Sequence, residues 1–286
     1  LTYALTEAGT TRTEYTIVRL GETAYYCVSA GAWTAYDADY LMKSAENRKA
    51  LKKALGYLDT AEQIDNLNPD VRKARLRLLV AAAVRHLKQN KTHLAQKDVT
   101  AIEALPQSRE KDRPAFGMAL KSVCAMIDQD EAEMTRWHRR LTERLEYPLA
   151  AHVVLQGLSK TCGLSHRQIH LPPSDNSALA GNDLVNAMAR GCQVADDMGI
   201  AVAIPWAYEK NLRDVFSDED LLHDTGAIRI IAETALKNGN LELAYAAAGA
   251  GLLQPCVAVA RFLLLRARSL PGWEIDRQDD CITAAI

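Results

Sequence analysis

The chain has 286 residues, enough for one large domain or two ordinary ones, each with a hydrophobic core. Its formal net charge is -2 and the charges are spread along the chain, which excludes a global basic field that would attract DNA or RNA. Aromatic residues account for only 6%, and Ala and Leu dominate, a composition that favours close-packed helices over a β-sandwich.

Residues 1–21 carry two alternative signals. Residues 13–19 are β-branched and roughly alternating, and Gly9-Thr10-Thr11 before them is typical of a turn, so a short β-hairpin is one expectation. A frayed first helix is the alternative. From residue 22 to residue 40, small and aromatic residues alternate, which predicts a helix packed by other helices.

Residues 44–162 predict a series of helices, because apolar residues recur three, four and seven positions apart. Turn and proline signals separate these helices at residues 68–70, 90–92, 106–114, 128–130 and 147–148.

Residues 163–177 predict an irregular seam, since they include the run Leu171-Pro172-Pro173. Further helices are expected after it, at residues 182–198, 203–216, 227–237, 241–253 and 256–269. The chain is therefore expected to divide into an N-terminal segment (1–21), a helical repeat region (22–162), an irregular linker (163–177) and a second helical repeat region (178–286).

The stretch from residue 241 to residue 265 is apolar and long enough to span a bilayer. However, Gln254-Pro255 lies at its centre, and it is rich in Ala and Gly rather than Leu and Ile. Two packed helices are the preferred interpretation.

The six cysteines are widely spaced and form no CxxC pair. Isolated cysteines on apolar helix faces are usually buried thiols in a reducing compartment, so a cytoplasmic location is expected. The chain begins with Leu1 and ends at Ile286 inside an expected helix, and we expect it to be a piece of a longer protein.

One segment of the first half is repeated in the second. Residues 87–106 (LKQNKTHLAQKDVTAIEALP) and 236–255 (LKNGNLELAYAAAGAGLLQP) align without a gap at a constant offset of 149 residues. The coincident residues are Leu87/Leu236, Lys88/Lys237, Leu94/Leu243, Ala95/Ala244, Ala101/Ala250 and Pro106/Pro255. This plan of helix, three-residue break, helix and final proline resembles the tetratricopeptide repeat (TPR) family.

The resemblance implies an all-α fold, an α-solenoid or superhelix of antiparallel helical hairpins, whose concave surface binds a peptide or partner protein. Ala232, Ala244 and Gly251 are at positions where the family places small residues. Two departures indicate irregular repeats, because Ala248 replaces a large residue and the Trp-Leu-Gly-Tyr signature is absent.

Two cationic clusters are candidate partner-binding sites. The first, on an expected first helix of a hairpin, comprises Arg72, Lys73, Arg75 and Arg77, which on a concave surface would hold a partner's carboxylates. The second comprises Arg136, Arg139, Arg140 and Arg144 around Trp137, which would stack on a base if the partner were RNA. The alternative is that both are solvated helix faces. For the second cluster, helix periodicity turns Trp137 inward and pairs the arginines with Glu133 and Glu143.

The remaining polar groups give weaker signals. Cys162, His166 and His170 have the spacing of zinc ligands on one helix face, but Gly163 and the prolines that follow argue against a helix there, and no fourth ligand is evident. The pairs Asp128/Asp130 and Asp196/Asp197 would suit acid–base chemistry, although capping or solvated aspartates are the default at helix ends.

No phosphate-binding, dinucleotide-binding, metalloprotease or nucleophile motif appears, so we expect no enzyme and no cofactor. The sequence predicts a non-catalytic protein-interaction, scaffold or regulatory region of a larger protein. The alternatives are an RNA-binding helical repeat, the regulatory part of an enzyme whose catalytic domain is outside this chain, and an all-α enzyme with a site near residues 163–177.

Overall fold

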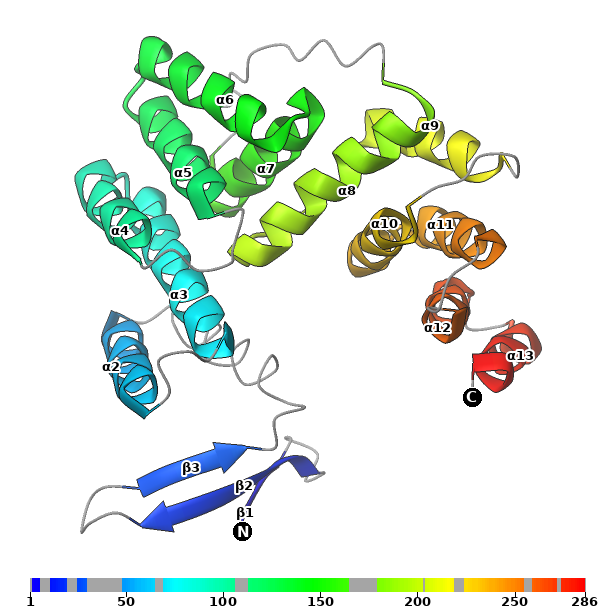
Figure 1. Cartoon of the computed structure of the whole chain (residues 1–286), viewed down its shortest axis with the longest axis horizontal. Helices are drawn as coiled ribbons and strands as arrows, with labels where there is room; N and C mark the ends of the chain where they lie inside the picture. The colour runs from blue at the N-terminus through cyan, green and yellow to red at the C-terminus, as the bar shows by residue number, and fades with distance from the viewer. Residues whose placement is uncertain are drawn as a thin grey trace. The chain divides into compact units, whose positions relative to one another are not determined.

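The computed structural model of the chain describes residues 2–5, 11–19, 25–29, 48–64, 69–105, 113–164, 179–202, 204–218, 224–254, 259–271 and 274–285. These residues form three strands followed by twelve helices (Figure 1). Contacts divide the chain into two compact units, residues 1–81 and 82–286.

The first unit begins with an antiparallel sheet in the order β1-β2-β3, formed by β1 (Thr2–Leu5), β2 (Thr11–Arg19) and β3 (Tyr25–Ser29). The pair β1–β2 is where the sequence favoured a short hairpin. The helix predicted from residue 22 to residue 40 is wrong at β3. Its aromatic and β-branched residues suit a pleated strand, and Cys27 pairs with Ile17 of β2.

From residue 48 onward every described element is a helix, in agreement with the predicted all-α class. In the first unit, α2 (Arg48–Ile64) is followed by α3 (Pro69–Lys88), which continues across the boundary at residue 81. Pro69 occupies the first position of α3, where its missing N–H costs no hydrogen bond.

The second unit contains the end of α3 and ten further helices. These are α4 (Thr92–Ala104), α5 (Arg113–Ile127), α6 (Glu131–Leu145), α7 (Pro148–Thr161), α8 (Gly181–Met198), α9 (Trp206–Phe216), α10 (Thr225–Lys237), α11 (Leu241–Leu253), α12 (Val259–Ser269) and α13 (Ile275–Ala285). They pack on near neighbours in sequence: α4 on α5, α5 on α6 and α7, α7 on α8, α8 on α10, α10 on α11, and α12 on both α11 and α13. Figure 1 shows this succession of neighbouring helices from α4 to α13.

Five helices of this unit end in the same local geometry. Each has a residue with positive φ just after the helix: Asn90, Gln129, Gly163, Gly199 and Gly239. The next amide donates back over five residues to the last turn, as Lys91 does to His86 O at 2.9 Å and Asn240 to Ala235 O at 2.9 Å. This is the Schellman type of helix end. It recurs at intervals of 34–40 residues, so the same helix-and-turn unit is used repeatedly.

The repeat found in the sequence is confirmed in the structure. α3 ends at Lys88 and α10 at Lys237, while Thr92–Ala104 of α4 corresponds to Leu241–Leu253 of α11, all at the offset of 149 residues. The left-handed residues Asn90 and Gly239 also correspond. The identities from Leu87/Leu236 to Ala101/Ala250 therefore reflect one backbone conformation, while the pair Pro106/Pro255 lies outside the described residues.

The apolar stretch from residue 241 to residue 265 is divided between α11 and α12, as the interpretation of two helices expected. Across the part of the chain that the structure describes, no helix has the length and apolar character needed to cross a bilayer.

A continuous core joins α7 to α12. It contains the buried small residues Ala232 and Ala244 and the fully buried Phe262, which lies against Gly251. The lack of a side chain at Gly251 leaves the room that the Phe262 ring occupies. The core therefore holds α11 and α12, two of the three helices that carry the candidate site described below, together with α7–α10.

The two repeated hairpins provide a matched test of helix capping. Asn240 Oδ1 accepts a hydrogen bond of 3.2 Å from Leu243 N, whereas the equivalent Lys91 makes no side-chain cap. Asn240→Ala is expected to lower the free energy of unfolding by about 1 kcal/mol. Urea denaturation measures this value. Equal losses for Asn240→Ala and the control Lys91→Ala would show that the cap does not contribute.

Candidate functional site

The first predicted cationic cluster does not form a free surface. Arg75 donates from Nη2 to Asp59 Oδ1 and from Nε to Glu62 Oε1, both at 2.7 Å, and so ties α3 to α2. Its side chain is only 14% exposed. Partial burial lowers the pKa of Arg75, but hydrogen bonds and charge from the two carboxylates outweigh burial and leave it raised. Arg75 is therefore a structural ion-pair residue.

The other members of the first cluster are also engaged within the chain. Arg72, Lys73 and Arg77 each take part in an interaction of their own, and Lys73 is exposed whereas Arg72 and Arg77 are partly buried. Arg75 is thus held by two carboxylates of α2, and a role of these four cations in binding a partner's carboxylates stays a prediction.

The second cluster is a solvated face of α6. Arg136 pairs with Glu133 at 2.7 Å and Arg139 lies 3.9 Å from Glu143, while Arg140 and Arg144 are exposed. This agrees with the predicted helix periodicity, and Leu141 is fully buried on the opposite side.

Trp137 lies half-buried among three cations. Lys121 Nζ is 4.5 Å from the ring centroid, and the guanidinium carbons of Arg140 and Arg136 are at 5.0 and 5.4 Å. These cation–π contacts occupy the indole that a base would need for stacking.

A polar seam between α6 and α7 was missed in the sequence. Four side-chain atoms are buried there without a hydrogen-bond partner among the described residues: His138 Nε2 and Thr142 Oγ1 on α6, and His152 Nδ1 and Gln156 Oε1 on α7. Each pair is four residues apart, so each shares one helix face. Burial lowers the pKa of both histidines, and the charge of His152 lowers the pKa of His138 further. His138 lies within the cationic run of α6, but it is 9% exposed and belongs to the core.

This seam predicts a loss of stability in acid. The unfolded chain binds protons at its histidines near the ordinary pKa of about 6.5, whereas the folded chain binds them only at lower pH. The free energy of unfolding should therefore fall as the pH drops from about 7 towards the lowered folded-state pKa values, and the histidines should cause no further loss below them. Urea denaturation across this range measures the slope. His138→Gln/His152→Gln should flatten it, and an unchanged slope in this variant would contradict the assignment.

The candidate zinc ligands are only partly within the described residues, since His166 and His170 lie outside them. Cys162 lies at the end of α7 and is 4% exposed. Burial raises the pKa of its thiol to about 12, which disfavours the thiolate that zinc requires. Among the residues that the structure describes, no group of three or more His, Cys, Asp or Glu could hold a metal ion.

The paired aspartates serve structural roles. Asp130 caps α6 by accepting from Glu133 N at 3.0 Å, and Asp128 accepts from Thr92 Oγ1 at 2.9 Å. Asp196 pairs with Lys237 at 2.9 Å, and Asp197 accepts from Gln193 at 3.0 Å. Capping and pairing, the default interpretation, account for these carboxylates.

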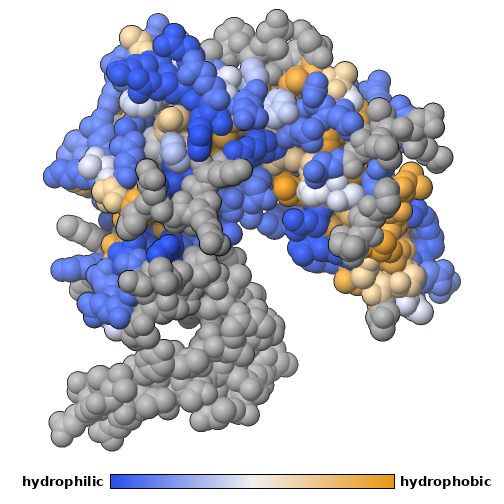
Figure 2. All heavy atoms as spheres, in the orientation of Figure 1, coloured by the Kyte–Doolittle hydropathy of each residue, from blue (hydrophilic) through white to orange (hydrophobic). Residues whose placement is uncertain are grey.

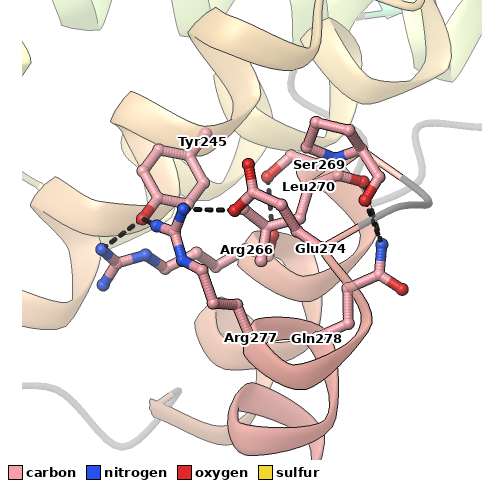
Figure 3. A network of polar contacts seen from close by, with 8 residues as sticks. Tyr245, Arg266, Ser269, Leu270, Glu274, Arg277 and Gln278 are labelled. Carbon is pink, nitrogen blue, oxygen red and sulfur yellow. Dashed lines mark hydrogen bonds and ion pairs between the residues drawn. The ribbon is translucent and has the colours of Figure 1, made fainter.

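The structure brings together a cluster that the sequence did not reveal (Figure 3). The hydroxyl oxygen of Tyr245 on α11 accepts from Arg266 Nη2 of α12 at 2.7 Å and from Arg277 Nη2 of α13 at 2.8 Å. Arg266 also lies over the phenol ring, its guanidinium carbon 4.6 Å from the centroid. Arg277 pairs with Glu274. We call Tyr245, Arg266, Arg277 and Glu274 the Tyr245 cluster.

Side-chain hydrogen bonds to backbone carbonyls of α12 and of residues 270–271 lie next to this cluster. Gln278 donates to Leu270 O at 3.0 Å and to Pro271 O at 3.1 Å, and Ser269 Oγ donates to Arg266 O at 2.8 Å. The two bonds of Gln278 tie α13 to residues 270–271 at the end of α12 (Figure 3). Because three helices contribute to the cluster, neighbouring positions in the sequence carry no sign of it.

Exposed apolar side chains gather on the same three helices. The large hydrophobic residues that are exposed in the described chain number seven, and five of them are on α11–α13: Leu241, Leu253, Val259, Leu264 and Ile282. Figure 2 shows hydrophobic surface over these helices. Exposed apolar patches rimmed by polar residues mark interaction sites or ligand-binding grooves.

Comparison with known proteins adds no relative. Neither protein-family models, nor curated proteins, nor solved structures give a match to this chain.

Proposed function

We propose that this chain is a non-catalytic protein-interaction or scaffold region of a larger cytoplasmic protein, built as an irregular TPR-like solenoid. Packing between near neighbours and the helix end that recurs every 34–40 residues support the solenoid. In such an array each helical hairpin buries its apolar face on the next, and the outer faces are left for partners.

One observation carries the interaction role: exposed apolar side chains and the Tyr245 cluster occur together on α11–α13. Leu253 is 57% exposed and Val259 44%, while Arg266 and Arg277 present guanidinium groups on the same helices. Arginine and tyrosine are enriched at protein interfaces, and exposed apolar patches mark interaction sites. We therefore place the partner-binding surface on α11–α13 rather than on the two cationic clusters found in the sequence.

Affinity purification of the protein from its own cells, followed by mass spectrometry and an RNA assay, tests this function. A stoichiometric protein partner should be lost when Leu253 and Val259 are both changed to Asp. It should be retained with Trp206→Asp, a control at an 85% exposed residue of α9. Retention of the partner by the double variant would refute the proposed surface.

The RNA-binding alternative depends on the face of α6. Co-purifying RNA that is lost on Arg139→Glu/Arg140→Glu, without a protein partner, would replace the proposed function with this alternative. The ion pairs of Arg136 and Arg139 and the cation contacts of Trp137 weaken it.

A further inference from the structure

We infer that the Tyr245 cluster is a receptor for a carboxylate, and that the partner on α11–α13 presents an acidic side chain next to aliphatic ones. This inference rests on the proposed function and specifies the chemistry of the partner. The charge of the cluster, the placement of its donors and the surface beside it all favour a carboxylate.

The charge of the cluster is incompletely compensated. Arg266 and Arg277 both donate to one neutral phenol oxygen, at 2.7 and 2.8 Å, so two cations share an acceptor that neutralises neither. Glu274 pairs with Arg277. Among the described residues no carboxylate pairs with Arg266. A carboxylate placed at the cluster would relieve this repulsion, since a charged acceptor bonds a guanidinium more strongly than a neutral one does.

The donors are held in place before a partner arrives. Arg266 is half-buried and stacked on the Tyr245 ring, and Arg277 is positioned by Tyr245 and Glu274. Guanidinium groups present several N–H donors in a planar fork that matches a carboxylate. Because little side-chain freedom remains to be lost at Arg266, binding costs less conformational entropy.

The surface beside the cluster suits aliphatic side chains. On α11, Gly249 and Leu252 follow Tyr245 by four and seven residues and so share its face. A Cβ built at Gly249 would meet no atom within 4 Å, so the surface above it is open. On α12, Val259 is seven residues before Arg266 and lies on the same face as it.

The spacing of Val259 and Arg266 along α12 sets the distance between the carboxylate and the aliphatic side chain of the partner segment. Seven residues of helix correspond to about 10 Å, so the carboxylate and the aliphatic contact should be separated by roughly that length. An acidic residue two helical turns from a Leu, Ile or Val meets this requirement, and a basic or wholly polar segment does not. The patch and the two arginines therefore complement an acidic amphipathic segment.

Selection from a displayed library of random peptides on the whole chain tests this inference. We expect selected peptides to combine Asp or Glu with aliphatic residues and to lose affinity by about tenfold or more on Arg266→Gln or Arg277→Gln. Replacing the peptide's acidic residue by its amide should produce the same loss of affinity. Combining the amide peptide with an arginine variant of the protein should weaken binding no further than either change alone.

The matched control is Arg268→Gln, which should leave affinity unchanged. Arg268 is exposed on α12 two residues from Arg266 and so lies on another face of that helix. Arg266→Lys keeps the charge but removes the fork, and it should also weaken binding. Circular dichroism confirms that each variant is folded, and Arg277→Gln, at a side chain 57% exposed, provides a second test if Arg266 variants unfold.

Two results would overturn the inference, in different ways. Peptides that lose affinity on Leu253→Asp/Val259→Asp but contain no acidic residue and ignore both arginine variants would refute the carboxylate receptor and leave the proposed function standing. Peptides that respond to no change on α11–α13 would refute both.

Discussion

Replacing Phe262 with alanine is expected to lower the free energy of unfolding by about 3–5 kcal/mol, as for other buried aromatic side chains. Phe262 is fully buried in the core shared by α7–α12, and its ring fills the space above Gly251. Thermal or urea unfolding of the two proteins measures the difference. A loss below about 1 kcal/mol would contradict the close packing of α11 on α12.

The converse change tests the same contact. A Cβ built on Gly251 would lie 2.4 Å from Phe262 Cε1 and 2.6 Å from Phe262 Cδ1, so Gly251→Ala forces the ring to move. Overpacking of this kind costs about 1–3 kcal/mol. Combining Gly251→Ala with Phe262→Leu should cost less than the sum of the two single changes, since the smaller side chain makes room for the methyl group. The control is Gly249→Ala on the same helix, where the new Cβ meets nothing within 4 Å and a gain of up to about 1 kcal/mol is expected.

A second large effect is expected where α7 meets α8. A Cβ on Gly191 would lie 2.9 Å from Val153 Cβ and 3.0 Å from Ala150 Cα, and these atoms cannot move without shifting α7. Gly191→Ala should therefore lower the free energy of unfolding by about 1–3 kcal/mol, despite the higher helix propensity of alanine.

Gly56→Ala is the control for this contact, because its Cβ meets nothing within 4 Å and it lies exposed on α2. It should be neutral or stabilising. If Gly191→Ala is as stable as the unchanged protein in urea denaturation, α7 and α8 do not approach as closely as described.

Local signals in the sequence were sufficient to predict the helices and helix ends of much of the helical region. Helix ends could be predicted where Gly, Asn or Pro impose a backbone geometry, as at Asn90 and Gly239, because these preferences depend on adjacent residues alone. The shared end after α5 uses Gln129, which carries weaker preference for positive φ, and its likeness to the other ends was visible only in the structure.

The same local signals could not predict strand β3. Alternating small and aromatic residues suit either a packed helix or a strand, and pairing with β2 decides between them. Pairing depends on residues that lie elsewhere in the chain, so no short window contains the answer.

The candidate site shows the same limit more strongly. Arg75 appeared as one cation among four, yet its partners Asp59 and Glu62 are on another helix. The Tyr245 cluster joins Tyr245 of α11 to Arg266 of α12 and Arg277 of α13. These arginines follow Tyr245 by 21 and 32 residues in the sequence. A run of cationic residues can be recognised in a sequence. A site assembled from single residues on three helices has no such run and cannot be recognised in this way.

The packing of each helix on its near neighbours also shapes how the second unit folds and how it responds to stress. Most contacts there join segments close in sequence, so little loop entropy is lost before they form, and folding should be fast for a chain of this length. Stability in such an array is the sum of local terms and interfaces between adjacent elements. Among the described helices α13 packs mainly on α12 alone, whereas α8 and α10 each pack on several helices, so α13 should exchange its amide hydrogens before they do. When force is applied to its two ends, the unit should unfold one helical hairpin at a time.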